Sequence, residues 1–188
     1  MMQRTLVLIK PDGVQRALIG KIIQRFEDVG LKIIGMKMIW IDQNFAEKHY
    51  PLNEEWAKAA YEKTKTSYEK SGKELKYTNY LDLGKDVQLK NMKFLCESPV
   101  LAMVLEGIHS IELVRKIIGS TEPKQALPGT IRGDFSHISY LRSDEKGTAV
   151  RNLLHASSDA DVAEKEIGLW FKPKELHSYK NVHDFHVL

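Results

Sequence analysis

The chain carries near its start the stretch Thr5-Leu6-Val7-Leu8-Ile9-Lys10-Pro11-Asp12-Gly13. The first five of these residues are apolar or β-branched, a composition that favours a β-strand. The Pro-Asp-Gly sequence that follows is a turn signal, because proline presets φ while aspartate and glycine tolerate turn conformations. The stretch therefore predicts a first strand that ends in a tight turn, with Lys10 where the strand stops.

Beyond this turn, strand-like and helical patterns alternate. Apolar residues recur at helical spacing over 19–29, and Gly30 stands where a helix commonly ends. Further strands are predicted at 31–41, 99–105 and 152–157, and further helices at 43–50, 54–70, 111–118 and 159–170. This alternation predicts an α/β chain in which one sheet carries the helices, and it leaves the strand order open.

The composition is that of an ordinary globular protein. A chain of 188 residues is expected to form one domain, which buries roughly 70% of its unfolded surface and needs no disulfide or structural metal. The 28 Lys+Arg nearly balance the 25 Asp+Glu, for a net charge of +3. Because the signs are mixed along the chain, no basic stripe of the kind that binds nucleic acid is indicated.

The single cysteine and the hydropathy pattern indicate a location. Cys96 cannot form an internal disulfide, which fits a reducing compartment, and the cytoplasm is the expected one. No run approaches the about 18 apolar residues that cross a bilayer, and the first residues lead into a strand pattern instead of a signal peptide. No membrane association is therefore expected.

Several phosphate-binding motifs are absent from the sequence. It contains neither Gly-x-x-x-x-Gly-Lys-Ser/Thr nor Gly-x-Gly-x-x-Gly, and it lacks the His-Arg-Asp and Asp-Phe-Gly pair. A P-loop kinase and a protein kinase are thus not indicated. With one cysteine, and only His183 and His186 closely spaced, a zinc site is not indicated either. A divalent ion is expected to arrive with a ligand.

His155 and Glu166 form the most informative pair. Alternation in the last predicted strand places Leu153, His155 and Ser157 on one side, and Glu166 falls on the inward stripe of the following helix. A carboxylate that accepts from one imidazole nitrogen leaves the other in a fixed tautomer, which makes a better nucleophile or base. The other reading is a purely structural His–Glu hydrogen bond, which periodicity alone favours.

Cationic residues at element boundaries give a second signal. Lys10 ends the first strand, Arg115 lies in a predicted helix, and Arg132 lies in the loop Pro128-Gly129-Thr130-Ile131-Arg132-Gly133-Asp134-Phe135. Solubility does not require an arginine among Gly, Pro and Phe, and the guanidinium fork suits phosphate oxygens. Taken singly, each of these residues could also be an ordinary surface charge.

Four blocks of this sequence resemble the nucleoside diphosphate kinase family. Asn152-Leu153-Leu154-His155-Ala156-Ser157 is similar to the Asn-x-x-His-Gly/Ala-Ser signature of that family. The other blocks are residues 5–12, the 128–135 loop and Ala163-Glu164-Lys165-Glu166-Ile167-Gly168-Leu169-Trp170-Phe171, all in the family's order. The resemblance implies a ferredoxin-like α+β sandwich with a four-stranded antiparallel sheet covered by helices.

The resemblance also implies an activity and its residues. A histidine matching His155 takes the γ-phosphoryl group from a nucleoside triphosphate such as ATP or GTP and passes it to a nucleoside diphosphate, by a ping-pong route with broad base tolerance. Glu166 would orient the ring and Ser157 would hydrogen-bond nearby. The positions that match phosphate and ribose ligands are Lys10, Arg115, Thr121, Arg132 and Asn152, and Tyr50 matches a tyrosine close to the histidine.

The same resemblance implies a cofactor and an assembly. Mg2+ would be carried by the nucleotide phosphates and would need no protein cage. The family forms homo-oligomers, either hexamers or tetramers, and a hexamer is expected here. The alternative is a non-catalytic scaffold or nucleic-acid-binding member of the same fold. That alternative predicts an eroded site, whereas every matching residue is present in this sequence.

The sequence departs from the family at two insertions, roughly 57–86 and 137–148. The first falls where common members carry a phenylalanine that stacks on the base, and the residues that counting brings there, Lys58 or Val87, are not aromatic. Trp56 could take this role or could simply pack the inserted helix, so the base platform is left unassigned. The acidic residue after the serine is also displaced by one, to Asp159, where it is expected to cap a helix.

Overall fold

A four-stranded antiparallel sheet organises the protein, for which the computed structural model describes residues 2–187. The strands β1 (Met2–Ile9), β2 (Lys32–Ile39), β3 (Val100–Ile108) and β4 (Leu154–Ala156) lie in the order β2-β3-β1-β4. Each neighbouring pair is antiparallel. This is the ferredoxin-like sheet that the family resemblance implied, and β1 lies inside it because it pairs with both β3 and β4.

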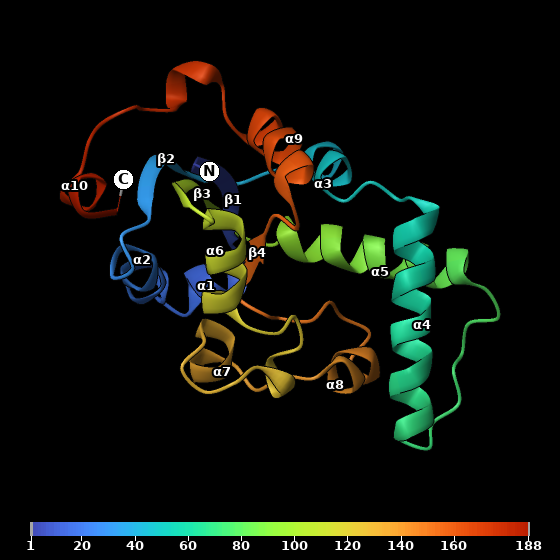
Figure 1. Cartoon of the computed structure of the whole chain (residues 1–188). Helices are drawn as coiled ribbons and strands as arrows, with labels where there is room; N and C mark the ends of the chain where they lie inside the picture. The colour runs from blue at the N-terminus through green and yellow to red at the C-terminus, as the bar shows by residue number, and fades with distance from the viewer. Residues whose placement is uncertain (1, 188) are drawn as a thin grey trace.

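Helices cover both faces of the sheet (Figure 1). On one face, α2 (Ile19–Glu27) and α6 (Ser110–Ile118) pack on Val7 and Ile9 of β1. On the other face, Leu6 and Leu8 meet α3 (Gln43–His49), α5 (Tyr80–Leu95) and α9 (Ala160–Trp170). The alternation of β1 side chains therefore separates two apolar clusters, and the second cluster borders the site described below.

The first insertion consists of α4 (Glu54–Lys70), a connecting segment and the start of α5. Helix α4 stands at the edge of the molecule, with α5 running from it toward the sheet (Figure 1). A long helix at 80–95 was not predicted, because its first half is polar and interrupted by Gly84. A Cβ at Gly84 would lie 2.8 Å from the Cβ of Ala57, so the glycine is what lets α4 and α5 approach.

The two insertions contact each other although they lie far apart in sequence. The second one contains α8 (Tyr140–Glu145), near the end of α4. Tyr68 Oη donates to Asp144 Oδ2 at 3.2 Å, and Lys73 Nζ donates to Glu145 Oε1 at 2.7 Å. The two insertions therefore pack against each other on one side of the molecule.

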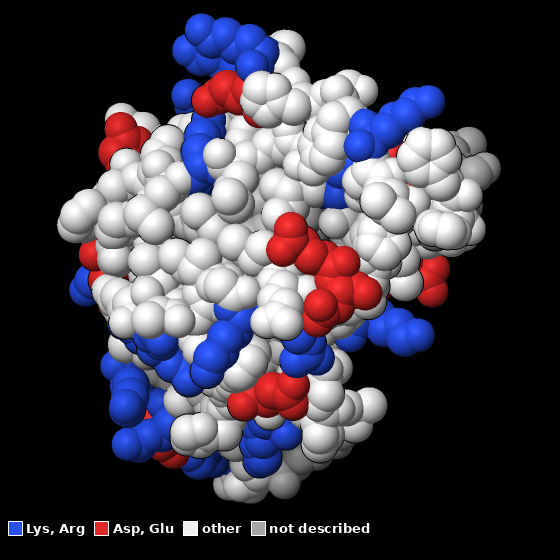
Figure 2. Space-filling model, turned by 90° about the vertical axis from the view of Figure 1, so that its left-hand side faces the viewer, with Lys and Arg blue, Asp and Glu red and all other residues white. Residues whose placement is uncertain are grey.

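The remaining elements are short. They are α1 (Pro11–Gln15), α7 (Ile131–Phe135), α10 (Val182–Val187) and the 3-10 turns Pro123–Gln125 and Pro173–Glu175. Within residues 2–187, no helix combines the length and hydropathy needed to span a bilayer. On the face seen in Figure 2, basic and acidic side chains are interspersed around a largely uncharged centre, in keeping with the mixed charge of the sequence.

Candidate active site

A γ-turn immediately before β4 sets the orientation of the candidate nucleophile. Leu153 adopts φ 70, and the amide of Leu154 donates to the carbonyl of Asn152 at 2.8 Å. This positive-φ turn is rare for a non-glycine residue and strained. It is held in place by the Leu153 amide, which donates to Asp12 Oδ2 at 3.1 Å, and by the Leu153 carbonyl, which accepts from the Lys10 amide at 2.8 Å.

The turn corrects one prediction. Leu153 does not share a face with His155 and Ser157 but belongs to the apolar cluster under α2 and α6. Strict alternation fails there because β4 begins only at Leu154, after the turn. His155 pairs with Leu8 of β1 and faces the layer of α3, α5 and α9.

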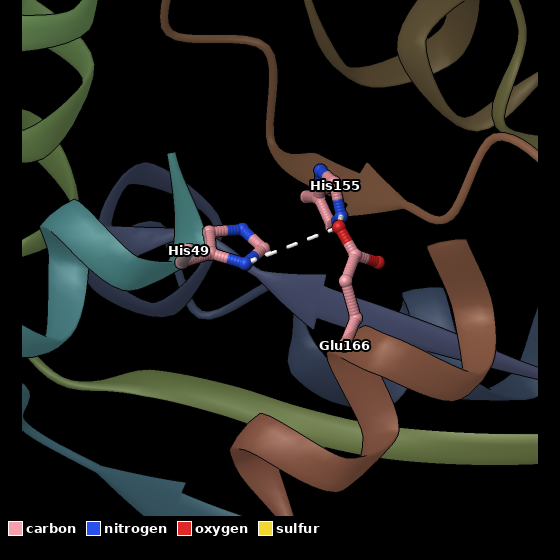
Figure 3. Close-up of side chains that lie close together, drawn as sticks. All are labelled: His49, His155 and Glu166. Carbon is pink, nitrogen blue, oxygen red and sulfur yellow. Dashed lines mark hydrogen bonds and ion pairs between the residues drawn. The ribbon is translucent and has the colours of Figure 1, made fainter. Parts of the chain in front are cut away.

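His155, Glu166 and Ser157 form a connected hydrogen-bond group. His155 Nε2 lies 2.8 Å from Glu166 Oε1, and Ser157 Oγ donates to Glu166 Oε2 at 2.6 Å. Ser157 Oγ in turn accepts from the Leu6 amide at 3.2 Å. Figure 3 shows His155 on β4 and Glu166 on α9 pointing toward each other. The predicted pair is therefore brought together by the return of α9 onto the sheet.

This geometry determines the tautomer of His155. An ionised carboxylate only accepts hydrogen bonds, so Nε2 must carry the proton that lies between the two groups. Nδ1 then has a free lone pair, and it points away from Glu166 in Figure 3. The His155 side chain is partly exposed, with 22% of its surface accessible. An oriented, accessible lone pair is what a nucleophile requires.

Replacing Glu166 with Gln should slow the chemistry and leave the fold almost unchanged. The amide keeps one acceptor but loses the charge and the second acceptor that Ser157 uses, so the His155 ring is no longer held in one tautomer. We expect a loss of about 10–100-fold in the rate of phosphoenzyme formation, measured by rapid quench. Glu164→Gln is the matched control, since Glu164 is exposed on the same helix and pairs with Arg4. An unchanged rate in Glu166→Gln would refute the orienting role.

Lys10, Asn152, Arg132 and Thr121 converge beside this group. Lys10 Nζ donates to Asn152 Oδ1 at 2.9 Å, and Asn152 Nδ2 donates to the Thr121 carbonyl at 2.9 Å. Arg132 Nε donates to the Asn152 carbonyl at 2.9 Å. Four of the predicted phosphate ligands thus come from separate segments of the chain, with Asn152 in contact with each of the other three.

Arg132 is anchored by the backbone. Its Nη1 and Nη2 donate to the carbonyls of Gly119 and Leu154, at 3.0 and 2.7 Å, in addition to the bond with Asn152. Gly119 has φ +84, a conformation that favours glycine. Burial lowers the pKa of Arg132 to about 10, which leaves it charged at neutral pH. Three of its five N–H groups are therefore used to hold it rigid, and two remain for a ligand.

Lys10 is nearly inaccessible, with 8% of its surface exposed. Burial, and then the charge of Arg132, lower the pKa of Lys10 to about 8, while the nearby Asp12 carboxylate opposes this shift. The ammonium also lies 5.9 Å from the centre of the Phe94 ring on α5. Two buried cations held side by side create a strong demand for an anion.

Two predicted site residues, Arg115 and Tyr50, lie outside the group of residues that hydrogen-bond to Asn152. Arg115 is exposed on α6, close enough to Arg132 to contribute to lowering the pKa of that guanidinium. Tyr50 packs its ring on His49, with centroids 4.6 Å apart, and His49 in turn packs on His155. Burial, and then the charge of Glu166, raise the pKa of Tyr50. The proposed roles of both residues stay predictions.

Trp56 lines a cavity that does not include the predicted phosphate ligands. That cavity measures about 630 Å3 and lies between α3, α4, α5 and α9, with Tyr50, Gln88, Asn91 and Glu166 among its walls. Lys10, Thr121 and Arg132 lie outside its lining. This position does not place Trp56 beside the phosphate ligands, and the base platform stays unassigned. Asp159 acts as a helix cap, as expected, because its Oδ1 accepts from the Val162 amide at 2.9 Å.

The sequence interpretation missed Asp12, which holds the strained turn, and His49, which packs against the nucleophile. Asp12 was treated only as part of a turn signal, and its role depends on the approach of β4 to β1. His49 stands next to Tyr50, which was the available hint. Neither role follows from local pattern, because Leu153, which Asp12 binds, and His155, on which His49 packs, each lie more than 100 positions away.

The side chains present fit a magnesium ion that the substrate brings. His49, His155 and Glu166 offer donor atoms within 4.8 Å of one another, but nitrogen ligands suit Mg2+ poorly. Both Glu166 oxygens already accept hydrogen bonds, and Asp12 Oδ2 accepts from the Leu153 amide, so Asp12 Oδ1 is the carboxylate oxygen of this group that has no partner among the described residues. One carboxylate oxygen does not make a cage for Mg2+, so phosphate oxygens would supply most of its ligands from outside the protein.

An oriented histidine, three residues after the Asn152 that binds both buried cations, is suited to phosphoryl transfer. Comparison with known proteins identifies the family. The family model described as nucleoside diphosphate kinase matches residues 3–73 and 81–176. A nucleoside diphosphate kinase of Pyrococcus horikoshii is 44% identical over 183 residues, covering 97% of this chain and 94% of that protein. One from Borreliella burgdorferi is 42% identical over 180 residues, covering 96% and 93%.

Solved structures agree with these matches. An NDP kinase from Pyrobaculum aerophilum superposes with a TM-score of 0.91 at 37% identity, covering 95% of this chain and 100% of that one. A transition-state mimic of the Borrelia burgdorferi enzyme with bound vanadate and ADP gives 0.81 at 40% identity, covering 98% and 96%. The chain therefore belongs to the nucleoside diphosphate kinase family. It is a kinase that moves a phosphoryl group between nucleotides, as the sequence predicted, and the non-catalytic alternative is not favoured.

Proposed function

We propose that His155 Nδ1 is the atom that carries the phosphoryl group. Nδ1 attacks the γ-phosphorus of a nucleoside triphosphate, an Nδ1–P bond forms, and the bond from phosphorus to the bridging oxygen breaks as the nucleoside diphosphate leaves. A second diphosphate then attacks the phosphohistidine and reverses these steps. The observation that carries this proposal is the 2.8 Å contact of His155 Nε2 with Glu166, which leaves Nδ1 unprotonated.

The cations supply most of the catalysis in this scheme. Phosphoryl transfer involves little covalent bonding in its transition state, so positioning and charge stabilisation dominate. Lys10 and Arg132, with Asn152 and Thr121, would hold the β- and γ-phosphates and the ribose in line with Nδ1. Arg115 would add a charge from the exposed side of α6. Rigid anchoring of Arg132 by three carbonyls supports this role, since it removes reorganisation during the reaction.

The remaining parts of the proposal rest on the family resemblance and on composition. Mg2+ on the nucleotide oxygens would neutralise part of the phosphate charge. Low base selectivity follows if the base stacks only at the mouth of the site. A single kinase domain over 1–188, a hexamer and a cytoplasmic location complete the proposal. Light scattering after size-exclusion chromatography tests the assembly.

One experiment tests nucleophile, reaction class and base tolerance together. The protein is incubated with [γ-32P]ATP and no acceptor, then challenged with ADP, GDP, CDP and UDP. We expect an acid-labile, base-stable phosphoprotein that each diphosphate discharges to labelled triphosphate. A protein that stays unlabelled, or whose label is acid-stable, would contradict the proposal.

The pKa of Lys10 predicts a pH dependence. The lysine must be protonated to attract phosphate, and its pKa of about 8 in the free protein means that the charge is present below that pH and lost above it. We therefore expect kcat/KM to fall above pH ~8, since this ratio reports the free enzyme. Lys10→Arg should move the fall to higher pH. A kcat/KM that stays flat to pH 10 in the unmodified protein would show that Lys10 does not titrate in this range.

A further inference from the structure

His49 is a buried imidazole that the proposed reaction does not use. It is the last residue of α3, and its side chain has no exposed surface. Its ring lies edge-on to His155, with centroids 4.6 Å apart and planes at 82°, and edge-on to Trp170 at 5.4 Å. Figure 3 shows it beside the nucleophile and its carboxylate partner.

Hydrogen bonding assigns one tautomer to His49. Trp170 Nε1 donates to His49 Nδ1 at 3.2 Å, and an indole N–H can only donate, so Nδ1 is unprotonated. The proton of the neutral ring is then on Nε2, which is buried and has no hydrogen-bond partner within residues 2–187. Burial, and then the charges of His155 and Lys10, hold the pKa of His49 well below its usual range, in agreement with a neutral ring.

The tautomer of His49 matters because its Nδ1 lies near the partner of the nucleophile. His49 Nδ1 is 4.0 Å from Glu166 Oε1, the same oxygen that accepts from His155 Nε2. With a lone pair on Nδ1, His49 cannot donate to that oxygen. With a proton there, a small ring rotation would let His49 donate to the same oxygen, and the bond from His155 Nε2 that defines its tautomer would be weakened.

Packing alone does not account for an imidazole at this position. The imidazole leaves its own Nε2–H unpaired in the described part of the chain, but it accepts the buried indole N–H of Trp170, which an apolar ring would leave without a partner. We propose that Trp170 is a positioning residue that acts through His49: the indole N–H holds His49 as the Nε2–H tautomer, so that Glu166 serves His155 alone. Trp170 follows Glu166 by one helical turn on α9, so one helix presents both the carboxylate and the lock.

The inference rests on the proposed role of His155, and its test uses Trp170→Phe in the full-length protein. This change keeps an aromatic ring and removes the donor. We expect the rate of phosphoenzyme formation to fall about tenfold, with KM for nucleotides changed less than twofold because no phosphate ligand is touched. In 15N NMR spectra of the imidazoles at pH 8, His155 should shift from one tautomer to a mixture.

A second substitution separates the lock from ordinary packing. His49→Phe alone should keep the original rate because no competing donor remains, and adding Trp170→Phe should then cause no loss of rate and no change in the His155 tautomer. His49→Leu offers the same logic with a smaller side chain. Phe45→Leu is the control, because Phe45 packs on the Trp170 ring at 4.8 Å; it should lower thermal stability and leave the tautomer intact.

Two results would overturn the inference. One is a Trp170→Phe protein with the original rate and a single His155 tautomer. The other is a rate loss from Trp170→Phe that is equally large with His49 present or replaced. If either is found while the original protein still forms the phosphoenzyme, the positioning role of Trp170 is refuted and the role of His155 stands.

Discussion

His155→Ala is expected to abolish the phosphoenzyme and to reduce turnover by on the order of 10⁴-fold or more, because nothing else can accept the phosphoryl group. The loss should appear in kcat, while binding of a nucleoside diphosphate by calorimetry changes little. Lys10 and Arg132 bind Asn152 and not the imidazole, so the proposed phosphate site should survive this change.

His155→Gln makes the same test without disturbing Glu166. Its amide N–H can still donate to Glu166 Oε1, which keeps the half-buried carboxylate partnered. We expect this variant to melt close to the original protein and to be equally inactive. His177→Ala, at an exposed ring outside the site, is the control and should label normally. Residual labelling of His155→Gln at the original rate would assign the nucleophile elsewhere.

Arg132→Lys should impair stability and activity together. A single ammonium cannot satisfy the carbonyls of Gly119, Asn152 and Leu154, so at least two lose their partner. We expect the free energy of unfolding to fall by about 3 kcal/mol, and a protein of this size should then melt roughly 10 °C lower. We expect kcat/KM to fall by about 100-fold, through both kcat and KM, because a phosphate clamp acts in the ground state and in the transition state.

Two measurements divide these effects. Calorimetric melting reports the carbonyl contacts, and steady-state kinetics well below the melting temperature report the phosphate contact. Arg142→Lys on exposed α8 is the control and should change neither. If Arg132→Lys melts early with unchanged kinetics, Arg132 is only an anchor for the loop. If it melts normally, the carbonyl contacts do not stabilise the fold.

The strands and helices that could be predicted are those whose burial is one-sided. Helices α2 and α6 each bury one apolar stripe against the sheet, so their apolar residues recur at helical spacing in the sequence. Helix α5 was missed because charged residues and Gly84 interrupt its apolar residues Leu83, Met92 and Leu95. Gly84 is needed there because α4 packs too closely for a side chain. A pattern of this kind becomes intelligible only once the partner helix is known.

At the site too, some features could be predicted from the sequence and others could not. His155 and Glu166 could be paired from sequence because both elements are close along the chain and their inward faces follow from alternation and helical period. The face of Leu153 was predicted wrongly, because the γ-turn that reverses it is held by Asp12, a residue 141 positions away. Local rules cannot include a hydrogen bond that forms only after β4 joins β1.

By itself, the sequence determined the histidine–carboxylate pair and the candidate cations from residue type and short spacing, and the family and its ferredoxin-like sheet from the resemblance of four blocks. Only the tertiary structure decided how those groups are held. The carbonyls that anchor Arg132, the contacts between the two insertions and the Trp170–His49–Glu166 arrangement all join residues that are distant in sequence. Such contacts form when burial brings the segments together, and buried polar groups then find the partners that they need.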